Sequence, residues 1–241
     1  MNIDVGFKKE LWNSKDPHKY DSHNDIVLKG FLSQLDKKIV QFVYDARNVL
    51  EIGCGTGRFI NSFRRSFVNK KIYGIDISLN MLKTAKNKNI NNILCSTGEN
   101  LPFKNNIFDA VVGCYYSFRW LDRKRAYKEI NLVLKKDGLL VFDIPNYYTY
   151  IIEGFLKNLR SFNILSKIES RASYDSLNLK NFNQEIKSLK AAGFEVLSIT
   201  STPYLPFLRR FIDTSNIYYP EVLSKLGYDY IFAVKKVNDV D

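Results

Sequence analysis

The sequence is poor in the residues that build disulfide frameworks, metal centres and membrane spans. Its three cysteines, Cys54, Cys95 and Cys114, are far apart and form no C-x-x-C pair, a pattern that fits neither a disulfide scaffold nor a zinc site. Only two histidines occur, His18 and His23. No run reaches the roughly 18 to 20 apolar residues of a membrane span, and the first residues lack the apolar core of a signal peptide. We therefore expect reduced thiols, no metal, no membrane contact and a cytoplasmic location.

The composition suits a globular protein with one large core. The chain has 241 residues, 45% hydrophobic and 14% aromatic, and this length favours one domain over two. The formal net charge of +11 raises the question of an anionic partner. The basic residues are spread in pairs along the chain, however, and the densest group is DRKRAYK, Asp122 to Lys128. A solvated lysine-rich surface is favoured over a nucleic-acid-binding one.

Short apolar runs alternate with segments of helical period from residue 48 onward. The strand candidates are NVLEI at 48–52, KIYGIDI at 71–77, NNILCS at 91–96, FDAVVGCYY at 108–116 and LLVFDI at 139–144. Ser78 is a plausible N-cap for the helix after the second of them. Strands that alternate with helices imply parallel pairing, because a parallel neighbour needs a connection about as long as a helix. The sequence predicts a Rossmann-like, doubly wound, mostly parallel α/β sheet with helices on both faces.

The C-terminal part departs from this alternation. Residues 147–180 are rich in aromatic residues and helical in period, which predicts an insertion. A helix and a strand near 195–200 follow, and the strand YDYIFAVKKV at 228–237 is expected to pair with the latter in antiparallel fashion. The chain is thus expected to form one domain: an N-terminal helical segment (1–46), a core (47–146), the insertion (147–180) and a C-terminal helix with strands (181–241).

Three glycines follow the first strand within five residues, at Gly53, Gly55 and Gly57. Such a turn lets the backbone approach a ligand closely at the carboxyl end of a strand. The segment GCGTGR does not match the dinucleotide fingerprint G-x-G-x-x-G, and Glu51 just before it would repel a pyrophosphate and suit a cationic ligand. Asp76, at the end of the second strand, is placed to accept hydrogen bonds from the two hydroxyls of a ribose.

Four segments in order carry a family resemblance: VLEIGCGTGRF, IYGIDISLNML, GENLPFKNNIFDAVV and KEINLVLKKDGLLVFDIPN. Together they resemble the class I S-adenosylmethionine-dependent methyltransferases, in particular the methyltransferase type 11 branch. The resemblance covers roughly residues 48–146, with weaker echoes near both ends. It implies S-adenosyl-L-methionine as cofactor. The cofactor-binding residues that it implies are Glu51, Gly53, Cys54, Gly55, Asp76, Ile77, Met81, Thr97, Gly98, Glu99 and Cys114.

The resemblance also implies roles for these residues. The glycine turn packs against the methionine part of the cofactor, with Glu51 near its ammonium, and Asp76 holds the ribose. Ile77 and Met81 pack the adenine faces. The family commonly has an aspartate at the place of Thr97, where it contacts the adenine amino group. Because Thr97 has only a hydroxyl, adenine recognition is expected to depend on the backbone around Gly98 and Glu99. The thiol of Cys114 is expected to be inert.

No catalytic triad or metal cluster is visible, and methyl transfer from an activated sulfonium requires mainly positioning. A general base is optional. His18 and His23 lie in a segment, HKYDSH, that resembles the lid of relatives, where a tyrosine such as Tyr20 lines the site. Tyr20, Tyr115 and Arg119 are the candidates for positioning the acceptor.

The methyl acceptor is left open among three hypotheses. A small-molecule acceptor is favoured by the family branch and the aromatic insertion. An RNA or protein acceptor is favoured only by the basic charge; the Asn/Asp-Pro-Pro-aromatic motif and the Pro-Cys pair of two nucleic-acid chemistries are absent after the fourth strand, where the chain reads CYYSFRW. A non-catalytic partner subunit with the same fold is the third. The oligomeric state is not predicted.

Overall fold

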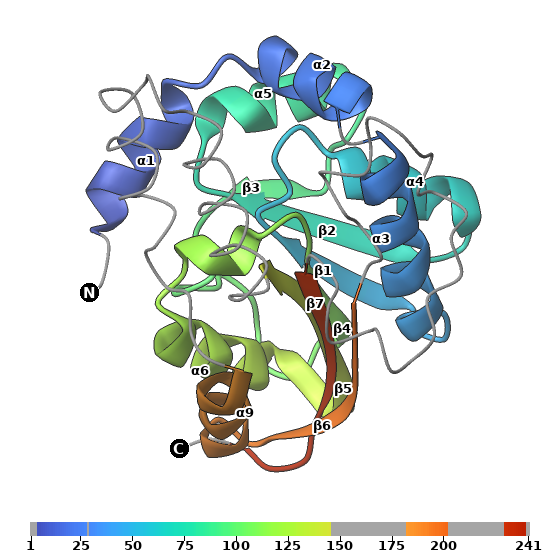
Figure 1. Ribbon diagram of the computed structural model, residues 1–241, viewed down its shortest axis with the longest axis vertical. Helices are drawn as coiled ribbons and strands as arrows, with labels where there is room; N and C mark the ends of the chain where they lie inside the picture. Colours follow the sequence, from blue (N-terminus) through green and yellow to red (C-terminus); the bar gives the residue numbers. More distant parts are fainter. Residues whose placement is uncertain (1–3, 28, 146–181, 202–228, 240–241) are drawn as a thin grey trace, which may run out of the picture.

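The computed structural model describes residues 4–27, 29–145, 182–201 and 229–239 (Figure 1). Among these residues seven strands form one sheet, in the order β3-β2-β1-β4-β5-β7-β6. Neighbours among β1 to β5 pair in parallel, whereas β7 runs antiparallel to both β5 and β6. The predicted sheet with its antiparallel C-terminal strand is confirmed. The strands are β1 Asn48–Ile52, β2 Lys71–Asp76, β3 Ile93–Cys95, β4 Phe108–Gly113, β5 Leu134–Pro145, β6 Phe194–Ser201 and β7 Asp229–Lys236.

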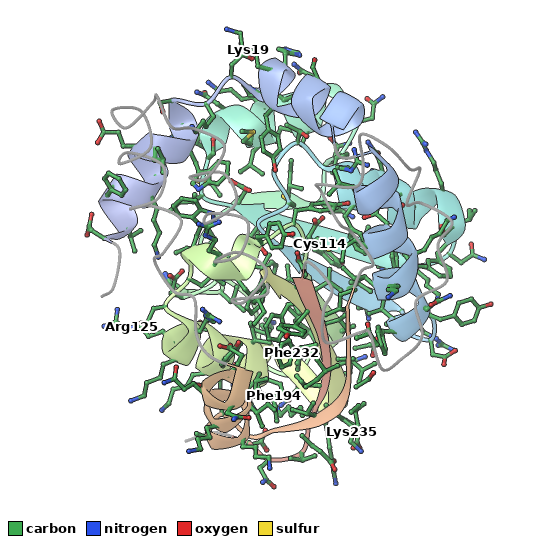
Figure 2. All side chains as sticks on the ribbon, in the orientation of Figure 1. Lys19, Cys114, Arg125, Phe194, Phe232 and Lys235 are labelled. Carbon is green, nitrogen blue, oxygen red and sulfur yellow. The ribbon has the colours of Figure 1, made fainter. Side chains whose placement is uncertain are left out.

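Helices cover both faces of the sheet. Because successive strand residues point to opposite sides, each strand packs against both helical layers. Val49 of β1 packs in a cluster with residues of α3, α4 and α5, and its neighbour Leu50 packs in a second cluster with residues of α6 and α9. Phe194 and Phe232 lie in the interior, whereas Lys19 and Arg125 lie at separate places on the periphery (Figure 2). The helices are α1 Val5–Asn13, α2 Pro17–Val27, α3 Lys29–Phe42, α4 Arg58–Ser66, α5 Leu79–Asn87, the 3₁₀ helix η1 Ser117–Trp120, α6 Arg123–Val133 and α9 Phe182–Ala191.

Two capping side chains set the start of the helices that follow β2 and η1. The Ser78 hydroxyl accepts the amide of Met81 at 3.3 Å, which confirms the predicted N-cap of α5. The Asp122 carboxylate caps α6 by accepting the amides of Lys124 and Arg125. Each such cap contributes about 1 kcal/mol. Ser78 also fixes the backbone immediately after Asp76, at the carboxyl edge of the sheet.

Several expectations concern residues beyond this description. The insertion at 147–180 lies outside the described residues, as do positions 202–228 of the C-terminal part. The division of the chain into four segments therefore stays a prediction.

The three cysteines are free thiols, as expected. In the described ranges, none of the helices combines the length and apolarity needed to traverse a bilayer.

Candidate functional site

One cavity lies at the carboxyl ends of β1 to β4, which meet at the same edge of the sheet (Figure 1). This is the edge at which open α/β sheets bind their ligands. The empty space at this site, part of which is open to solvent, is about 890 Å³, and side chains of α1 and α2 complete the cavity wall. The predicted site residues that line it are Tyr20, Gly53, Cys54, Gly55, Asp76, Ile77, Met81, Thr97, Gly98, Cys114 and Tyr115.

The glycine turn is held against β2 and open toward the cavity. The amides of Gly53 and Cys54 both donate to the Ile75 carbonyl, at 2.8 and 2.9 Å. Gly53 and Gly55 have positive φ angles of 75° and 52°, a conformation that glycine adopts without strain. A Cβ added at Gly53 would lie 2.7 Å from the Cβ of Ser117, whereas one added at Gly55 would meet no described atom within 4 Å. Gly55 therefore borders the space that a ligand would fill.

Asp76 links the turns after β1 and β2. One carboxylate oxygen accepts the Gly55 amide and the other accepts the Ser78 amide, both at 2.8 Å. Burial raises the pKa of Asp76, and these backbone hydrogen bonds oppose the rise. A carboxylate has about four acceptor sites, so Asp76 keeps acceptor capacity for ligand hydroxyls.

Glu51 lies outside the cavity wall, at the end of β1. Its side chain is buried, with 1% of the residue exposed, and its Oε2 atom has no hydrogen-bond partner among the described residues. Burial raises the pKa of Glu51 well above its usual value, and the negative charges of Asp36 and Asp76 raise it further. A buried carboxylate oxygen without a partner suits a cationic or donor group, and the ammonium of a methionine moiety is such a group.

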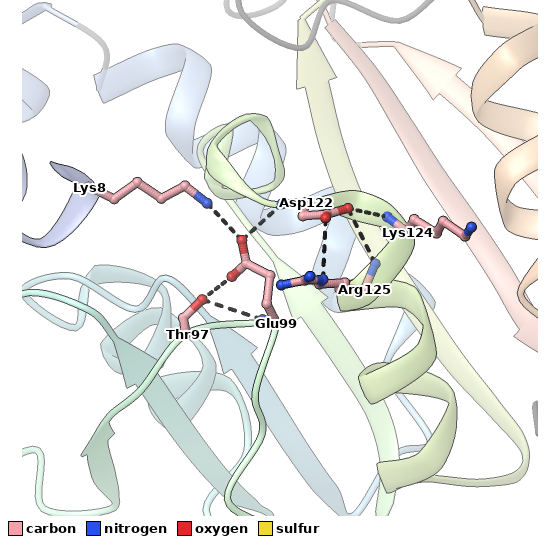
Figure 3. Close-up of polar contacts among 6 residues, drawn as sticks. All are labelled: Lys8, Thr97, Glu99, Asp122, Lys124 and Arg125. Atoms are coloured by element: carbon pink, nitrogen blue, oxygen red, sulfur yellow. Dashed lines mark hydrogen bonds and ion pairs between the residues drawn. The ribbon is translucent and has the colours of Figure 1, made fainter. Parts of the chain in front are cut away.

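Glu99 also lies outside the cavity wall, and protein groups occupy its carboxylate. It accepts the Lys8 ammonium at 2.7 Å, the Asp122 amide at 2.9 Å and the Thr97 hydroxyl (Figure 3). Burial acts to raise the pKa of Glu99, but the Lys8 and Thr97 side chains and the Asp122 amide together hold it below its usual value. The role near adenine that was predicted for Glu99 concerns its backbone. The structure adds a contact of its ionised side chain, which pairs with Lys8 of α1.

The turn after β4 contains two non-glycine residues in the left-handed region. Tyr115 and Tyr116 have φ angles of 59° and 62°, and the buried carboxylate of Asp143 accepts the Tyr116 amide at 3.1 and 3.2 Å. Such backbone strain is typical of functional sites, where the surrounding structure maintains it. The turn presents Tyr115 to the cavity, with its hydroxyl donating to Asp36 of α3. Arg119, the third positioning candidate, does not line the cavity.

The thiol next to this turn is chemically quiet. Cys114 is 1% exposed, and its side chain lies near the centre of the molecule (Figure 2). Burial raises the pKa of the Cys114 thiol well above its usual value, as do the charges of Glu51, Asp143 and Asp36. A thiol with a raised pKa is a poor nucleophile at neutral pH, in agreement with the sequence-based expectation.

The N-terminal helices contribute more of the site than the sequence indicated. Trp12 lines the cavity, and its ring makes edge contacts with Trp120 and Tyr20 at centroid distances of 5.6 and 6.2 Å. The Ser78 hydroxyl donates to the Trp12 carbonyl at 3.2 Å. His18 is exposed and does not line the cavity. Trp120, from the aromatic segment after β4, also lines the cavity. The lining residues that sequence reasoning missed are Lys8, Trp12, Ile52, Thr56, Arg58, Ile75, Ser96, Ser117 and Leu121.

Some of these residues had a signal in the sequence. Thr56 and Arg58 belong to the glycine turn and its helix, and Ser117 belongs to the segment CYYSFRW after β4. Each lies one to three residues from a predicted site residue. Lys8 and Trp12 had no such neighbour, because they reach the site from a helix that is distant in the sequence.

Comparisons with known proteins agree with this geometry. The sequence model of the family described as "Methyltransferase domain" matches residues 50–142. An uncharacterised protein of Methanocaldococcus jannaschii is 31% identical over 213 residues, which cover 79% of this chain and 82% of that protein. The ubiquinone/menaquinone biosynthesis C-methyltransferase UbiE of Campylobacter jejuni is 30% identical over 216 residues, which cover 80% of this chain and 91% of that protein.

A solved structure shares the fold. The S-adenosylmethionine-dependent methyltransferase of Thermotoga maritima superposes with a TM-score of 0.62 at 23% identity, covering 91% of this chain and 95% of that one. The chain belongs to the class I S-adenosylmethionine-dependent methyltransferases. Its cofactor is S-adenosylmethionine, as the resemblance implied.

Proposed function

We propose that this methyltransferase acts on a small-molecule acceptor, and that the cavity at the carboxyl ends of β1 to β4 binds both cofactor and acceptor. The observation that supports this most directly is the enclosure of the cavity. The glycine turn and Asp76 form one side, and the aromatic side chains of Tyr20, Tyr115 and Trp120 form others. Partly enclosed, mostly apolar sites with a few polar groups are typical of small ligands. The Campylobacter jejuni relative, named as a quinone C-methyltransferase, favours the same class of acceptor.

The residues present fit the cofactor. Asp76 would hold the ribose through the free acceptor sites of its carboxylate, while the Gly55 and Ser78 amides keep that carboxylate in place. Gly55 would leave room for the methionine part, since a Cβ added there would contact no described residue beyond its chain neighbours within 4 Å. Glu51 would lie near the ammonium but behind the cavity wall, with its unpartnered oxygen available to a bridging water. When bound, the cofactor supplies an activated methyl group on a sulfonium.

The protein's part in the reaction is therefore to position, enclose and desolvate. The described part of the cavity wall lacks a histidine that could act as a general base. The pKa values of Cys114 and Tyr115 in this wall are raised, which keeps both side chains protonated. Its aromatic rings exclude water around the acceptor, and correct placement of two reactants can supply on the order of 7 to 11 kcal/mol of the barrier. Tyr115, fixed by its hydrogen bond to Asp36, is the wall residue best held to orient an acceptor.

Two measurements test this function. Calorimetry with S-adenosylmethionine and S-adenosylhomocysteine, with and without EDTA, should show binding of both in the absence of metal. Incubation with methyl-labelled cofactor should then transfer label to a small molecule, tested with a soluble naphthoquinol, an amine panel and a metabolite extract. Label appearing only in added tRNA or in protein would refute the small-molecule assignment and favour the alternative suggested by the net charge of +11. Cofactor binding without transfer to any of these acceptors would favour the non-catalytic partner subunit.

A further inference from the structure

Helix α1 has two adjacent lysines in opposite environments. Lys8 is 4% exposed and lines the cavity, whereas Lys9 is exposed to solvent. A lysine is almost never buried without a partner, and Lys8 has one in Glu99, at 2.7 Å. The side chains of Lys8 and Glu99 are only 5% and 7% exposed. Because desolvating both charges offsets much of their attraction, such a pair is weak evidence of stabilisation. Its presence in the wall of a binding cavity therefore needs a reason other than folding.

The surroundings of Lys8 leave N–H donors of its ammonium free at this end of the cavity. Glu99 is already engaged by Lys8, Thr97 and the Asp122 amide (Figure 3). The Thr97 hydroxyl is engaged in turn, since it donates to Glu99 and accepts the Glu99 amide at 3.4 Å. An ammonium has three N–H donors, and a single acceptor for Lys8 lies among the described residues. Two donors thus remain beside Thr97 and Gly98, both of which line the cavity after β3.

This is the end of the cavity at which adenine would lie if Asp76 holds the ribose, since Thr97 and Gly98 follow β3, the strand next to β2. Adenine offers ring nitrogens that accept hydrogen bonds. We propose that Lys8 is a specificity-determining residue for the adenine base: its ammonium, held in the wall by Glu99, donates to a ring nitrogen of adenine. This inference rests on the proposed placement of the cofactor. It gives the N-terminal helix a direct part in cofactor recognition, together with the backbone after β3.

Deaza analogues of S-adenosylhomocysteine provide the test, because each replaces one ring nitrogen by C–H with little change of shape. Dissociation constants are measured by calorimetry for the parent ligand and its 1-, 3- and 7-deaza forms. In the wild type one analogue should bind about 10-fold more weakly, the loss expected for one hydrogen bond to a charged donor. In Lys8→Met the parent should bind about 10-fold more weakly, and that analogue should show no further loss.

Lys9→Met is the matched control, since it removes an exposed charge from the same helix and should leave all four constants unchanged. Lys8→Gln keeps an N–H donor and should retain part of the discrimination. It also serves as the second variant if Lys8→Met does not fold.

The ratio of each analogue's dissociation constant to that of the parent ligand distinguishes a contact between Lys8 and adenine from a role of Lys8 in holding α1 against the cavity. If Lys8→Met weakens all four ligands equally, Lys8 only anchors the helix and the proposal is wrong. Unchanged binding in Lys8→Met, or a wild type indifferent to all three analogues, would also overturn it. A wild type that fails to bind the parent ligand at all would refute the cofactor site itself, an outcome distinct from loss of the Lys8 assignment alone.

Discussion

Replacing Asp76 by alanine should weaken cofactor binding and lower stability, and a matched control separates the two effects. If the carboxylate accepts hydrogen bonds from both ribose hydroxyls, its removal should cost about 1.5 to 3 kcal/mol of binding free energy, or roughly 10- to 150-fold in the dissociation constant. The structure adds a second effect. Asp76 also accepts the Gly55 and Ser78 amides at 2.8 Å. Losing both should cost roughly 1 to 3 kcal/mol of folding free energy, in part offset by removal of a buried charge.

Asp109 supplies a matched control at the opposite edge of the sheet. Its carboxylate likewise accepts two backbone amides, those of Arg47 and Asn48, at 3.0 and 2.7 Å, and it pairs with Lys135 at 2.6 Å. Asp109→Ala should therefore lower stability by a similar amount. It should leave cofactor affinity unchanged, because Asp109 lies at the start of β4, far along the strand from the cavity.

The assay is calorimetry with S-adenosylhomocysteine together with thermal unfolding of each protein. For a chain of this size, each kcal/mol lowers the melting temperature by about 2 to 4 °C. Asp76→Asn keeps one acceptor oxygen and should fall between wild type and alanine in both measurements. If Asp76→Ala lowers the melting temperature as Asp109→Ala does but binds the ligand like wild type, then Asp76 only ties the two turns together and the ribose assignment is refuted.

Three further predictions follow from the same site. Glu51→Gln should raise the melting temperature at pH 8 and have little effect below the usual glutamate pKa of 4.5, because a raised folded-state pKa means that stability is lost as pH rises; an equal effect at both pH values would contradict this. The same variant should weaken cofactor binding. Gly55→Val should abolish detectable binding in calorimetry while the far-UV circular dichroism spectrum stays native, since the added side chain fills open space at a φ of 52°; unchanged affinity would mean that the turn is only structural. Trp12 and Trp120, the two tryptophans of the chain, both line the cavity, so S-adenosylhomocysteine should change the intrinsic fluorescence, and Trp12→Phe should reduce that change.

The core of the fold was predictable because its signals are local. Each parallel strand of the 48–145 region contains a short apolar run, although β5 begins at Leu134, before the predicted run at 139–144. Each crossover helix has its own period, and a serine or aspartate marks the start of two of them. The glycine turn and Asp76 were predictable for the same reason, since a strand end and the next few residues fix where they lie. Their proximity follows from the parallel pairing of β1 and β2, which brings the Gly55 amide to the Asp76 carboxylate.

The N-terminal wall of the site could not be predicted in this way. Lys8 and Glu99 are 91 residues apart, and nothing in the residues around Lys8 distinguishes it from Lys9. What distinguishes it is how α1 docks, through the Trp12 contact with Trp120 and the hydrogen bonds from Ser78 and Asn80 to the Trp12–Asn13 backbone. Those contacts place one face of α1 against the cavity and turn Lys9 to solvent. Thr97, at the place where the family commonly has an aspartate, gave reason to expect a different mode of adenine recognition. The tertiary packing of α1 supplies the residue that we propose for a different contact, with an adenine ring nitrogen.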